Sequence, residues 1–215
     1  LVKNNDTYSI VRIERSLAFL SLREGNLQEA LDYLMKARIS AESLPADGQD
    51  AAAINLLEAR IRRALNQNSA ALAHLQASLA IYRPRGFRIE SAQVLIELAH
   101  VLLEDPVTDN LVEALNNLEQ AETLLETLAV PLLLALIHLE QGELLHKLGR
   151  SAVAAERAQA ALTPFAAHGL TLREAQATAL RADCTWQLAP QTAQAHYRHA
   201  LELASEAAPL IAVRC

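Results

Sequence analysis

The sequence contains few of the residues that build strands, disulfides or membrane spans. Aromatic residues make up 4% of the 215 positions, and there are two cysteines and six glycines. No apolar run approaches the roughly 20 residues that cross a bilayer. The abundance of Ala and Leu favours closely packed helices over strands, and 52% hydrophobic residues can bury a core without a metal or a disulfide. The composition therefore predicts an all-α protein.

The ends and the cysteines of the sequence indicate where the protein works. Residues 1–6 lack the basic and then apolar pattern of a signal peptide. Cys184 and Cys215 have no CxxC partner, which is typical of thiols in a reducing compartment. We therefore expect a cytoplasmic protein with no contact to a membrane. Residues 209–215 resemble the start of a helix that is not completed, so we expect a fragment of a larger chain.

Common catalytic motifs are also missing from the sequence. There is no G-x-S-x-G, no G-x-x-x-x-G-K-[ST], no H-E-x-x-H and no G-x-G-x-x-G. Five further histidines are scattered, and we expect them at ordinary helix positions: His74, His138, His168, His196 and His199. The sequence therefore predicts a protein that is not an enzyme and that needs no cofactor.

An internal repeat is the strongest pattern that is present. Residues 25–31, GNLQEAL, recur as residues 109–115, DNLVEAL, with five of seven positions identical at a separation of 84. A copy near the midpoint and two later copies complete a set of alanines, which we call the anchors. The anchors are Ala30, Ala71, Ala114, Ala154 and Ala193. They follow one another at intervals of 39 to 43 residues.

The residues that follow each anchor predict a helix with a regular packing face. Positions +4 and +7 from an anchor lie on the same face of a helix. The +4 residues are Leu34, Leu75, Leu118, Ala158 and Tyr197, and the +7 residues are Ala37, Ser78, Ala121, Ala161 and Ala200. Small residues at the anchor and at +7 let a neighbouring helix come close. Each anchor thus marks helix B of a hairpin, with helix A upstream and prolines between hairpins at Pro45, Pro84, Pro131 and Pro209.

This pattern resembles the tetratricopeptide repeat (TPR) family, which has alanine, a large residue and alanine in helix B and often Leu-Gly in helix A. The match is best from Gln141-Gly142 through Leu148-Gly149 to Ala154. The period is longer than the usual 34 residues of the family, and the early aromatic residue of helix A is mostly missing. The repeats therefore resemble the elongated kind in bacterial signal-transduction ATPases that activate transcription, such as the maltose-regulon activator, and the arrays attached to caspase-like peptidases.

The resemblance implies a right-handed α-solenoid of about five antiparallel TPR-like hairpins. We expect one domain over residues 1–215, with units at roughly 8–44, 49–83, 88–130, 132–168 and 171–207. In the last unit, Trp186 and Tyr197 are expected to pack the hairpin. An exposed apolar end at Leu201, Leu203, Leu210 and Ile211 would allow self-association.

The resemblance also implies that a ligand binds on the face formed by the A helices. Eight positions match that face: Arg12, Arg15, Phe19 and Arg23, then Arg60 and Arg63, then Glu143 and His146. Guanidinium groups pair well with carboxylates and phosphates. We therefore expect an acidic protein or peptide, or a small anionic effector. The alternative is a solvated face on which the arginines form salt bridges with Glu14, Glu24 and Glu58.

Two Glu-x-x-His pairs, Glu97/His100 and Glu143/His146, match the pattern that binds paired metal ions in ferritin-like bundles. Their glutamates lie 17 and 11 residues before their anchors, so the two pairs occupy different heights on their helices. They are not expected to face each other. We therefore expect no metal site.

The charge distribution excludes another class of partner. Residues 1–90 carry 12 Lys or Arg against 10 Asp or Glu, whereas residues 91–215 carry 7 against 15. With a pI near 5.7 and no basic stripe interleaved with aromatics, the chain is not expected to bind nucleic acid directly.

Two functions remain consistent with the sequence. One is the sensor region of a bacterial multidomain transcriptional regulator, which binds an effector or protein and passes the signal to another domain. The other is a constitutive adaptor that assembles a complex, or a repeat region attached to a caspase-like peptidase. Neighbouring domains would distinguish these functions.

Overall fold

The computed structural model describes the backbone of residues 2–44, 48–104 and 110–212 and the side chains of residues 6–44, 48–104 and 110–207. The described residues form ten α-helices and one short 3₁₀ helix, with no strand among them. The all-α prediction is therefore confirmed. Pro45, Cys215 and the side chains of Pro209, Leu210 and Ile211 lie outside the described residues.

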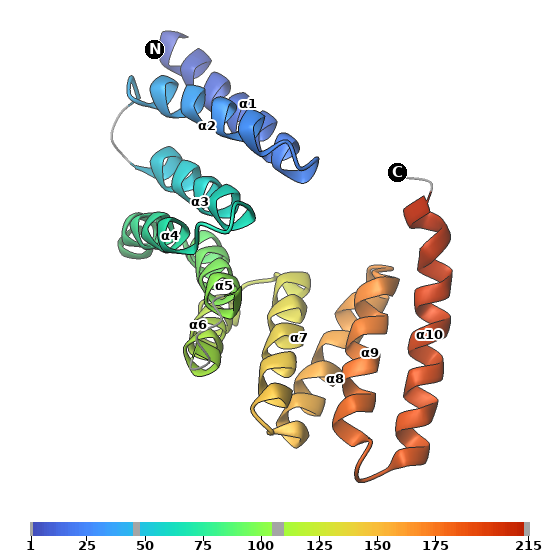
Figure 1. Cartoon of the computed structure of the whole chain (residues 1–215). Helices are drawn as coiled ribbons and strands as arrows, with labels where there is room; N and C mark the ends of the chain where they lie inside the picture. The colour runs from blue at the N-terminus through green and yellow to red at the C-terminus, as the bar shows by residue number, and fades with distance from the viewer. Residues whose placement is uncertain (1, 45–47, 105–109, 213–215) are drawn as a thin grey trace. The chain divides into compact units, whose positions relative to one another are not determined.

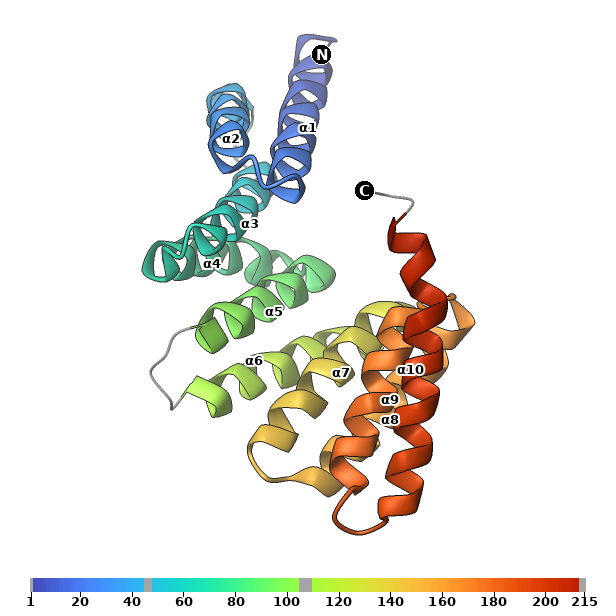
Figure 2. The same cartoon turned by 45° about the vertical axis from the view of Figure 1, so that its right-hand side comes forward.

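Helices and short connections follow one another along the chain, in the order that the hairpin prediction requires (Figure 1). They are α1 (Val2–Arg23), α2 (Leu27–Ala41), α3 (Gln49–Ala64), α4 (Asn68–Tyr82), η1 (Arg83–Arg85), α5 (Arg88–Glu104), α6 (Asn110–Leu125), α7 (Pro131–Lys147), α8 (Ser151–Ala167), α9 (Thr171–Thr185) and α10 (Pro190–Ala212). Helices α1 to α5 and helices α7 to α10 pack each against the next, most extensively α1 on α2, α3 on α4, α7 on α8 and α9 on α10. Helices α7 to α10 lie side by side in Figure 2.

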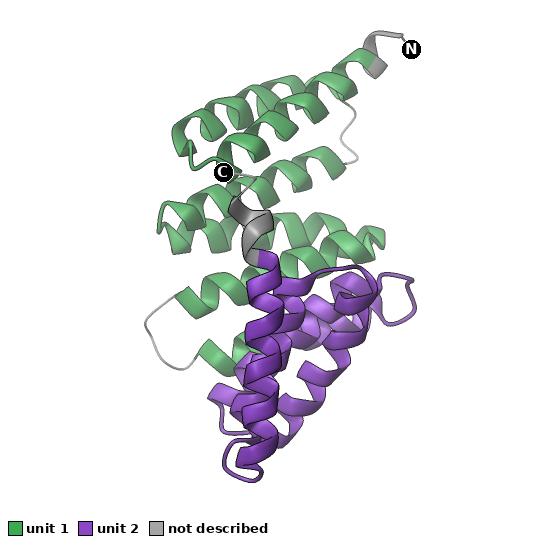
Figure 3. Cartoon of the chain, turned by 90° about the vertical axis from the view of Figure 1, so that its right-hand side faces the viewer, with its two compact units in different colours: residues 1–117 green, residues 118–215 purple. Residues whose placement is uncertain are grey.

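The chain divides into two compact units, residues 1–117 and 118–215 (Figure 3). Unit 1 contains α1 to α5 and the first half of α6, and unit 2 contains the rest. Each unit is described by itself below. The grouping of all five hairpins into a single domain stays a prediction.

The anchors lie in the core of their units. All five anchor alanines are completely buried, and so are most residues at +4 and +7. The same column continues to +11, where Leu125 and Phe165 are also fully buried. Position +4 of the last hairpin is different, because Tyr197 is 38% exposed and donates its hydroxyl hydrogen to Asp183 on α9. Small residues at the anchors let paired helices approach closely, as the sequence predicts.

Three of the turns between helices A and B have the same geometry. Gly25, Asn66 and Gly149 each occupy a left-handed conformation, with φ of 81°, 57° and 76°. In each turn the next residue's backbone N–H reaches back to a carbonyl of the last helical turn: Asn26 to Ser21, Gln67 to Arg62 and Arg150 to Leu145, at 2.8–2.9 Å. This is the Schellman motif, which satisfies carbonyls at the helix end and favours glycine or asparagine at the left-handed position.

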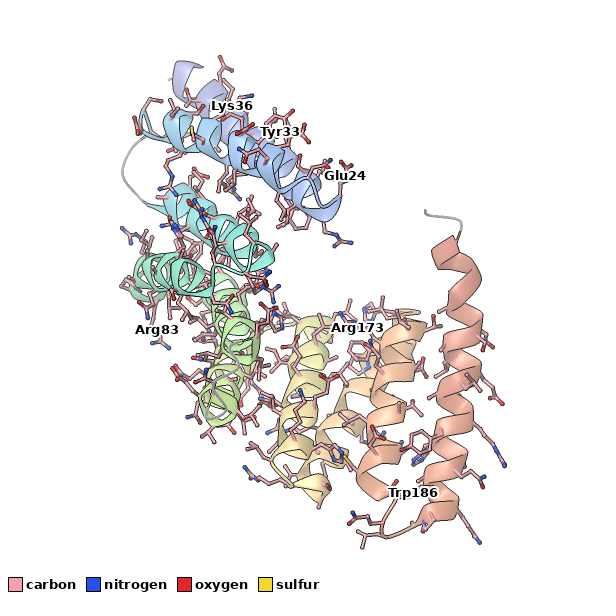
Figure 4. All side chains as sticks on the ribbon, in the orientation of Figure 1. Glu24, Tyr33, Lys36, Arg83, Arg173 and Trp186 are labelled. Atoms are coloured by element: carbon pink, nitrogen blue, oxygen red, sulfur yellow. The ribbon has the colours of Figure 1, made fainter. Side chains whose placement is uncertain are left out.

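The turn between α9 and α10 is built differently. It has no glycine and exposes Trp186 and Leu188 by 53% and 89%, and Figure 4 shows Trp186 at this turn. The expectation that Trp186 packs the fifth hairpin is therefore wrong. More than half of the Trp186 surface is exposed to solvent at this turn.

The Leu-Gly feature of the TPR family has a packing reason in unit 2. A Cβ atom at Gly142 would lie 2.9 Å from Cδ2 of Leu180 and 3.2 Å from the carbonyl oxygen of Ala154. Both distances are shorter than ordinary carbon contacts. Glycine at this position lets α7 contact α8 and α9. At the corresponding positions of the first two hairpins Ala18 and Ala59 are buried.

Among the described residues, no helix is both long enough and apolar enough to span a membrane.

Candidate functional site: a groove in unit 1

A groove of about 1,100 Å³ opens on unit 1. It is formed by α1, α3, the end of α4 and the start of α5. Its lining includes Tyr8, Arg12, Arg15 and Phe19 from α1, Asp50, Leu56, Leu57 and Arg60 from α3, Tyr82 from α4, and Glu90 and Gln93 from α5. Apolar and charged side chains thus face the same space.

Four of the eight predicted site residues line this groove: Arg12, Arg15, Phe19 and Arg60. Arg23 and Arg63 are absent from its lining, although Arg23 lies at the exposed end of α1. Glu143 and His146 belong to unit 2. The structure therefore brings together the first part of the predicted set. Whether these residues bind a ligand stays a prediction.

Ion pairs with other helices occupy three of the predicted arginines. Arg15 lies 2.9 Å from Asp50, and Arg60 lies 2.7 Å from Glu97. Arg63 lies 3.5 Å from Glu97 and 3.3 Å from Glu104. These partners connect α1 to α3 and α3 to α5, so the pairs hold the walls of the groove together.

Glu14, Glu24 and Glu58 were expected to pair with the arginines of a solvated face, but they form no ion pair with the predicted arginines among the described residues. Glu58 binds Arg38 and Arg62 at 2.6 and 3.1 Å, with His74 at 3.2 Å. Glu24 accepts a hydrogen bond from its neighbour Asn26. One carboxylate oxygen of Glu14 is buried without a hydrogen-bond partner among the described residues. Three of the predicted arginines are therefore paired, but with acidic residues other than the three that this alternative expected.

Glu97 is the most strongly perturbed acid in the described part of unit 1. Burial by itself would raise the pKa of its carboxyl group, but the adjacent His100 and the positive charges of Arg60 and Arg63 lower that pKa to about 2. The carboxylate is therefore ionised at neutral pH and keeps both arginines in place. The glutamate of the first Glu-x-x-His pair therefore forms ion pairs with two arginines, which gives it a structural role.

Tyr82 lies at the floor of the groove and was not predicted from the sequence. Its side chain is almost completely buried, with 2% of the residue exposed, and its ring packs edge-on against Phe87. Burial, opposed by Arg15 and reinforced by Glu90 and Asp50, raises the pKa of its hydroxyl to about 12. The hydroxyl is therefore protonated at any physiological pH. Among the described residues it has no hydrogen-bond partner.

A signal for Tyr82 was present in the repeat. It occupies position +11 from its anchor, where the third and fourth hairpins have Leu125 and Phe165. Of these three residues only Tyr82 carries a polar group, and this difference within the +11 column is the signal in the sequence.

The predicted residues of unit 2 do not form a comparable site. Glu143 is exposed, while Nδ1 of His146 lies 3.3 Å from the hydroxyl of Ser151 and 3.5 Å from the sulfur of Cys184. Burial and the neighbouring Asp183 raise the pKa of the Cys184 thiol. A protonated thiol is a poor nucleophile, so this contact gives no support to catalysis. No metal-binding cluster of His, Cys, Asp or Glu occurs in the described part of the chain.

A second apolar surface lies on the first hairpin, outside the groove lining. Ile10, Ile13 and Leu17 of α1 are exposed, as are Met35 and Ile39 of α2. At the other end of the chain Leu201 is 68% exposed. Nothing in the structure shows what covers either surface, and self-association stays a prediction.

Comparisons with known proteins support the fold. No protein-family model and no curated protein matches the sequence. Among solved structures, BtubC from P. vanneervenii has a TM-score of 0.72 and 16% identity over 97% of this chain and 82% of its own. Apo RapI has a TM-score of 0.75 and 12% identity over 92% of this chain and 54% of its own. A putative kinesin light chain from P. anserina, with nearly identical TPR-like repeats, has a TM-score of 0.70 and 18% identity over 91% of this chain and 95% of its own.

These similarities define the class of fold. The described residues form TPR-like helical hairpins, and that part of the resemblance is confirmed. The chain spans about half the length of RapI. At these identities the likeness concerns the fold alone and says nothing of a ligand.

Proposed function

We propose that this chain is a protein-binding helical-repeat module and that the groove of unit 1 holds an extended segment of its partner. One observation carries the proposal: Tyr82 lines the groove, and its hydroxyl makes no hydrogen bond with any described residue. The hydroxyl is therefore available to donate a hydrogen bond to a ligand in the groove.

The size and lining of the groove support a peptide over a small effector. Pockets for drug-sized molecules commonly measure about 300–1,000 Å³, and this open groove is larger, at about 1,100 Å³. Phe19, Leu56 and Leu57 provide apolar contacts. The guanidinium group of Arg12 has no ion-pair partner in the described part of the chain, so it is available to a carboxylate of the partner.

We further propose that the module belongs to a cytoplasmic multidomain regulator of the bacterial signal-transduction ATPase type, in which occupancy of the groove controls another domain. The elongated repeat supports this role by resemblance. An adaptor that holds its partner permanently is the alternative. A P-loop ATPase and a helix-turn-helix elsewhere in the parent protein would favour the regulator.

A displayed library of random peptides tests the groove. We expect the purified chain to enrich peptides whose affinity falls about fivefold in Tyr82→Phe, the equivalent of one neutral hydrogen bond of about 1 kcal/mol. Because the hydroxyl has no internal partner, Tyr82→Phe should unfold at the same temperature as the wild type. Met35→Ser, on the second apolar surface, is the matched control. Peptides that lose affinity in Met35→Ser but not in Tyr82→Phe would place the binding surface elsewhere.

A further inference from the structure

Some of the charged side chains that line the groove form ion pairs within the chain, whereas others of both signs have no such partner among the described residues. Asp50 neutralises Arg15, and Glu97 neutralises Arg60. Among the residues that the structure describes, the guanidinium of Arg12 and the carboxylate of Glu90 line the groove without an ion-pair partner. The groove is therefore not simply basic, as its arginines suggest, because its described lining presents both an unpaired cation and an unpaired anion.

The two unpaired charges come from different walls of the groove. Arg12 projects from α1, whereas Glu90 lies in the first turn of α5. Tyr82 is at the end of α4 and lines the same groove. The carboxylate of Glu90 thus belongs to the α5 wall, and the guanidinium of Arg12 belongs to the α1 wall.

We infer that the groove selects a mixed-charge peptide segment, with an acidic side chain that pairs with Arg12 and a basic side chain that pairs with Glu90. The hydroxyl of Tyr82 donates a hydrogen bond to a carbonyl group of the same segment. This inference rests on the proposed function, and it replaces the expected acidic partner with one that carries both charges.

Charge complementarity favours this partner over a segment of one sign. A purely acidic segment would bring carboxylates towards Glu90, and a purely basic segment would bring cations towards Arg12. In both cases a groove charge would lose water without gaining a partner, which weakens binding. A mixed segment satisfies both charges. The same arrangement rejects partners of uniform charge by repulsion.

Synthetic peptides with controlled charge test the inference. The probes are fluorescently labelled peptides of about ten residues, long enough to cross the groove at about 3.3 Å per extended residue. They share one apolar sequence and carry one Glu and one Lys at systematically varied spacings. Matched peptides carry Gln in place of Lys, of Glu, or of both. Affinity is measured by fluorescence anisotropy at low and at physiological salt.

We expect the best mixed-charge peptide to bind about fivefold more tightly than either single-charge peptide, as for partly exposed ion pairs. Arg12→Gln should abolish the advantage of the peptide's Glu, and Glu90→Gln should abolish the advantage of its Lys. Arg23→Gln, on the same helix but absent from the groove lining, is the matched control and should change neither.

Two other results would have different meanings. If no peptide binds, the groove is not a peptide site and the proposed function fails as well. If acidic peptides bind as tightly as mixed ones and Glu90→Gln leaves Lys-containing peptides unaffected, the proposed function stands and the mixed-charge inference is overturned. A carboxylate in the first turn also stabilises a helix. A lower melting temperature in Glu90→Gln with unchanged selectivity would therefore assign Glu90 to helix stability alone.

Discussion

In both units a glutamate with a largely covered side chain connects helices, but the units differ in what remains unpaired. In unit 2, Glu122 on α6 accepts hydrogen bonds from His138 and Gln141 of α7 and from Arg157 of α8, at 2.6–3.0 Å. In unit 1, Glu97 and Asp50 take up three arginines. The side chains of Arg12, Glu90 and Tyr82 also line the groove, and they have no ion-pair or hydrogen-bond partner among the described residues.

This difference distinguishes residues that fix helix packing from residues that we propose bind a ligand. A carboxylate shared between neighbouring helices fixes how they pack, because leaving a charge unpaired in a partly buried place is costly. The same type of cluster occurs in both units and therefore has a structural role. Arg12, Glu90 and Tyr82 take part in no such cluster among the described residues, and ligand binding by them is our proposal.

The largest expected effect comes from the core of unit 2. Phe165 is fully buried, and Phe165→Ala should lower the free energy of unfolding by about 3–5 kcal/mol. Trp186 is the chain's single tryptophan and lies in unit 2, so its fluorescence should report an earlier urea transition. Leu75→Ala, which removes a fully buried side chain from unit 1, is the variant for comparison with Phe165→Ala.

Hydrogen exchange on the same two variants tests the division into units. Each hairpin of a repeat protein depends mainly on its neighbours. Amides of α7 to α9 should therefore lose protection in Phe165→Ala, and amides of α1 to α4 should lose it in Leu75→Ala. Equal loss throughout the chain in both variants would show that the two units unfold as one.

A smaller effect is expected from acid titration of Glu97. Its pKa is about 2 in the folded chain against the usual 4.5, so the folded state prefers the ionised form. The resulting stability is complete above about pH 4.5 and is lost as the pH falls towards 2. Its size is on the order of 3 kcal/mol. Urea unfolding between pH 7 and pH 3 should show a smaller acid-induced loss in Glu97→Gln than in the wild type.

Glu122 gives a second test of the same cluster type. Burial would raise the pKa of Glu122, but Gln141, Arg157 and His138 together lower it. The acid-induced loss should therefore be reduced in Glu122→Gln as well. Identical pH curves for the wild type and both variants would contradict the role given to these clusters.

The smallest effect is expected at the turn between α9 and α10. Leu188 is 89% exposed, so Leu188→Ser should change the free energy of unfolding by less than about 0.5 kcal/mol. Thermal melting followed by circular dichroism provides the measurement. A larger loss would mean that this side chain packs in solution.

The repeat pattern predicted the fold because packing constrains every period. All five anchor alanines are buried, and Gly25 and Gly149 mark turns that require a left-handed residue. The α9–α10 turn escaped prediction because its sequence has no such residue. Periodicity therefore identifies hairpins well, but not how each turn directs its side chains.

The candidate site was less accessible to sequence reasoning. Helical spacing placed Arg12, Arg15, Phe19 and Arg60 on the groove face, since all four lie on A helices. It could not show that Asp50 and Glu97 neutralise two of these arginines, because those pairs join residues 35 and 37 positions apart. It also missed Glu90 and Tyr82, which reach the groove from α5 and α4. Pairing between helices, and not the number of arginines, decides the charge of the groove.

Hydrogen exchange of the chain with and without a mixed-charge peptide tests the central claim most directly. We expect the peptide to slow exchange in the parts of α1, α3 and α5 that contain Arg12, Asp50 and Glu90, and we expect this protection to be smaller in Tyr82→Phe at a peptide concentration near the dissociation constant. Protection confined to unit 2, or to the face of α2 that carries Met35 and Ile39, would contradict it.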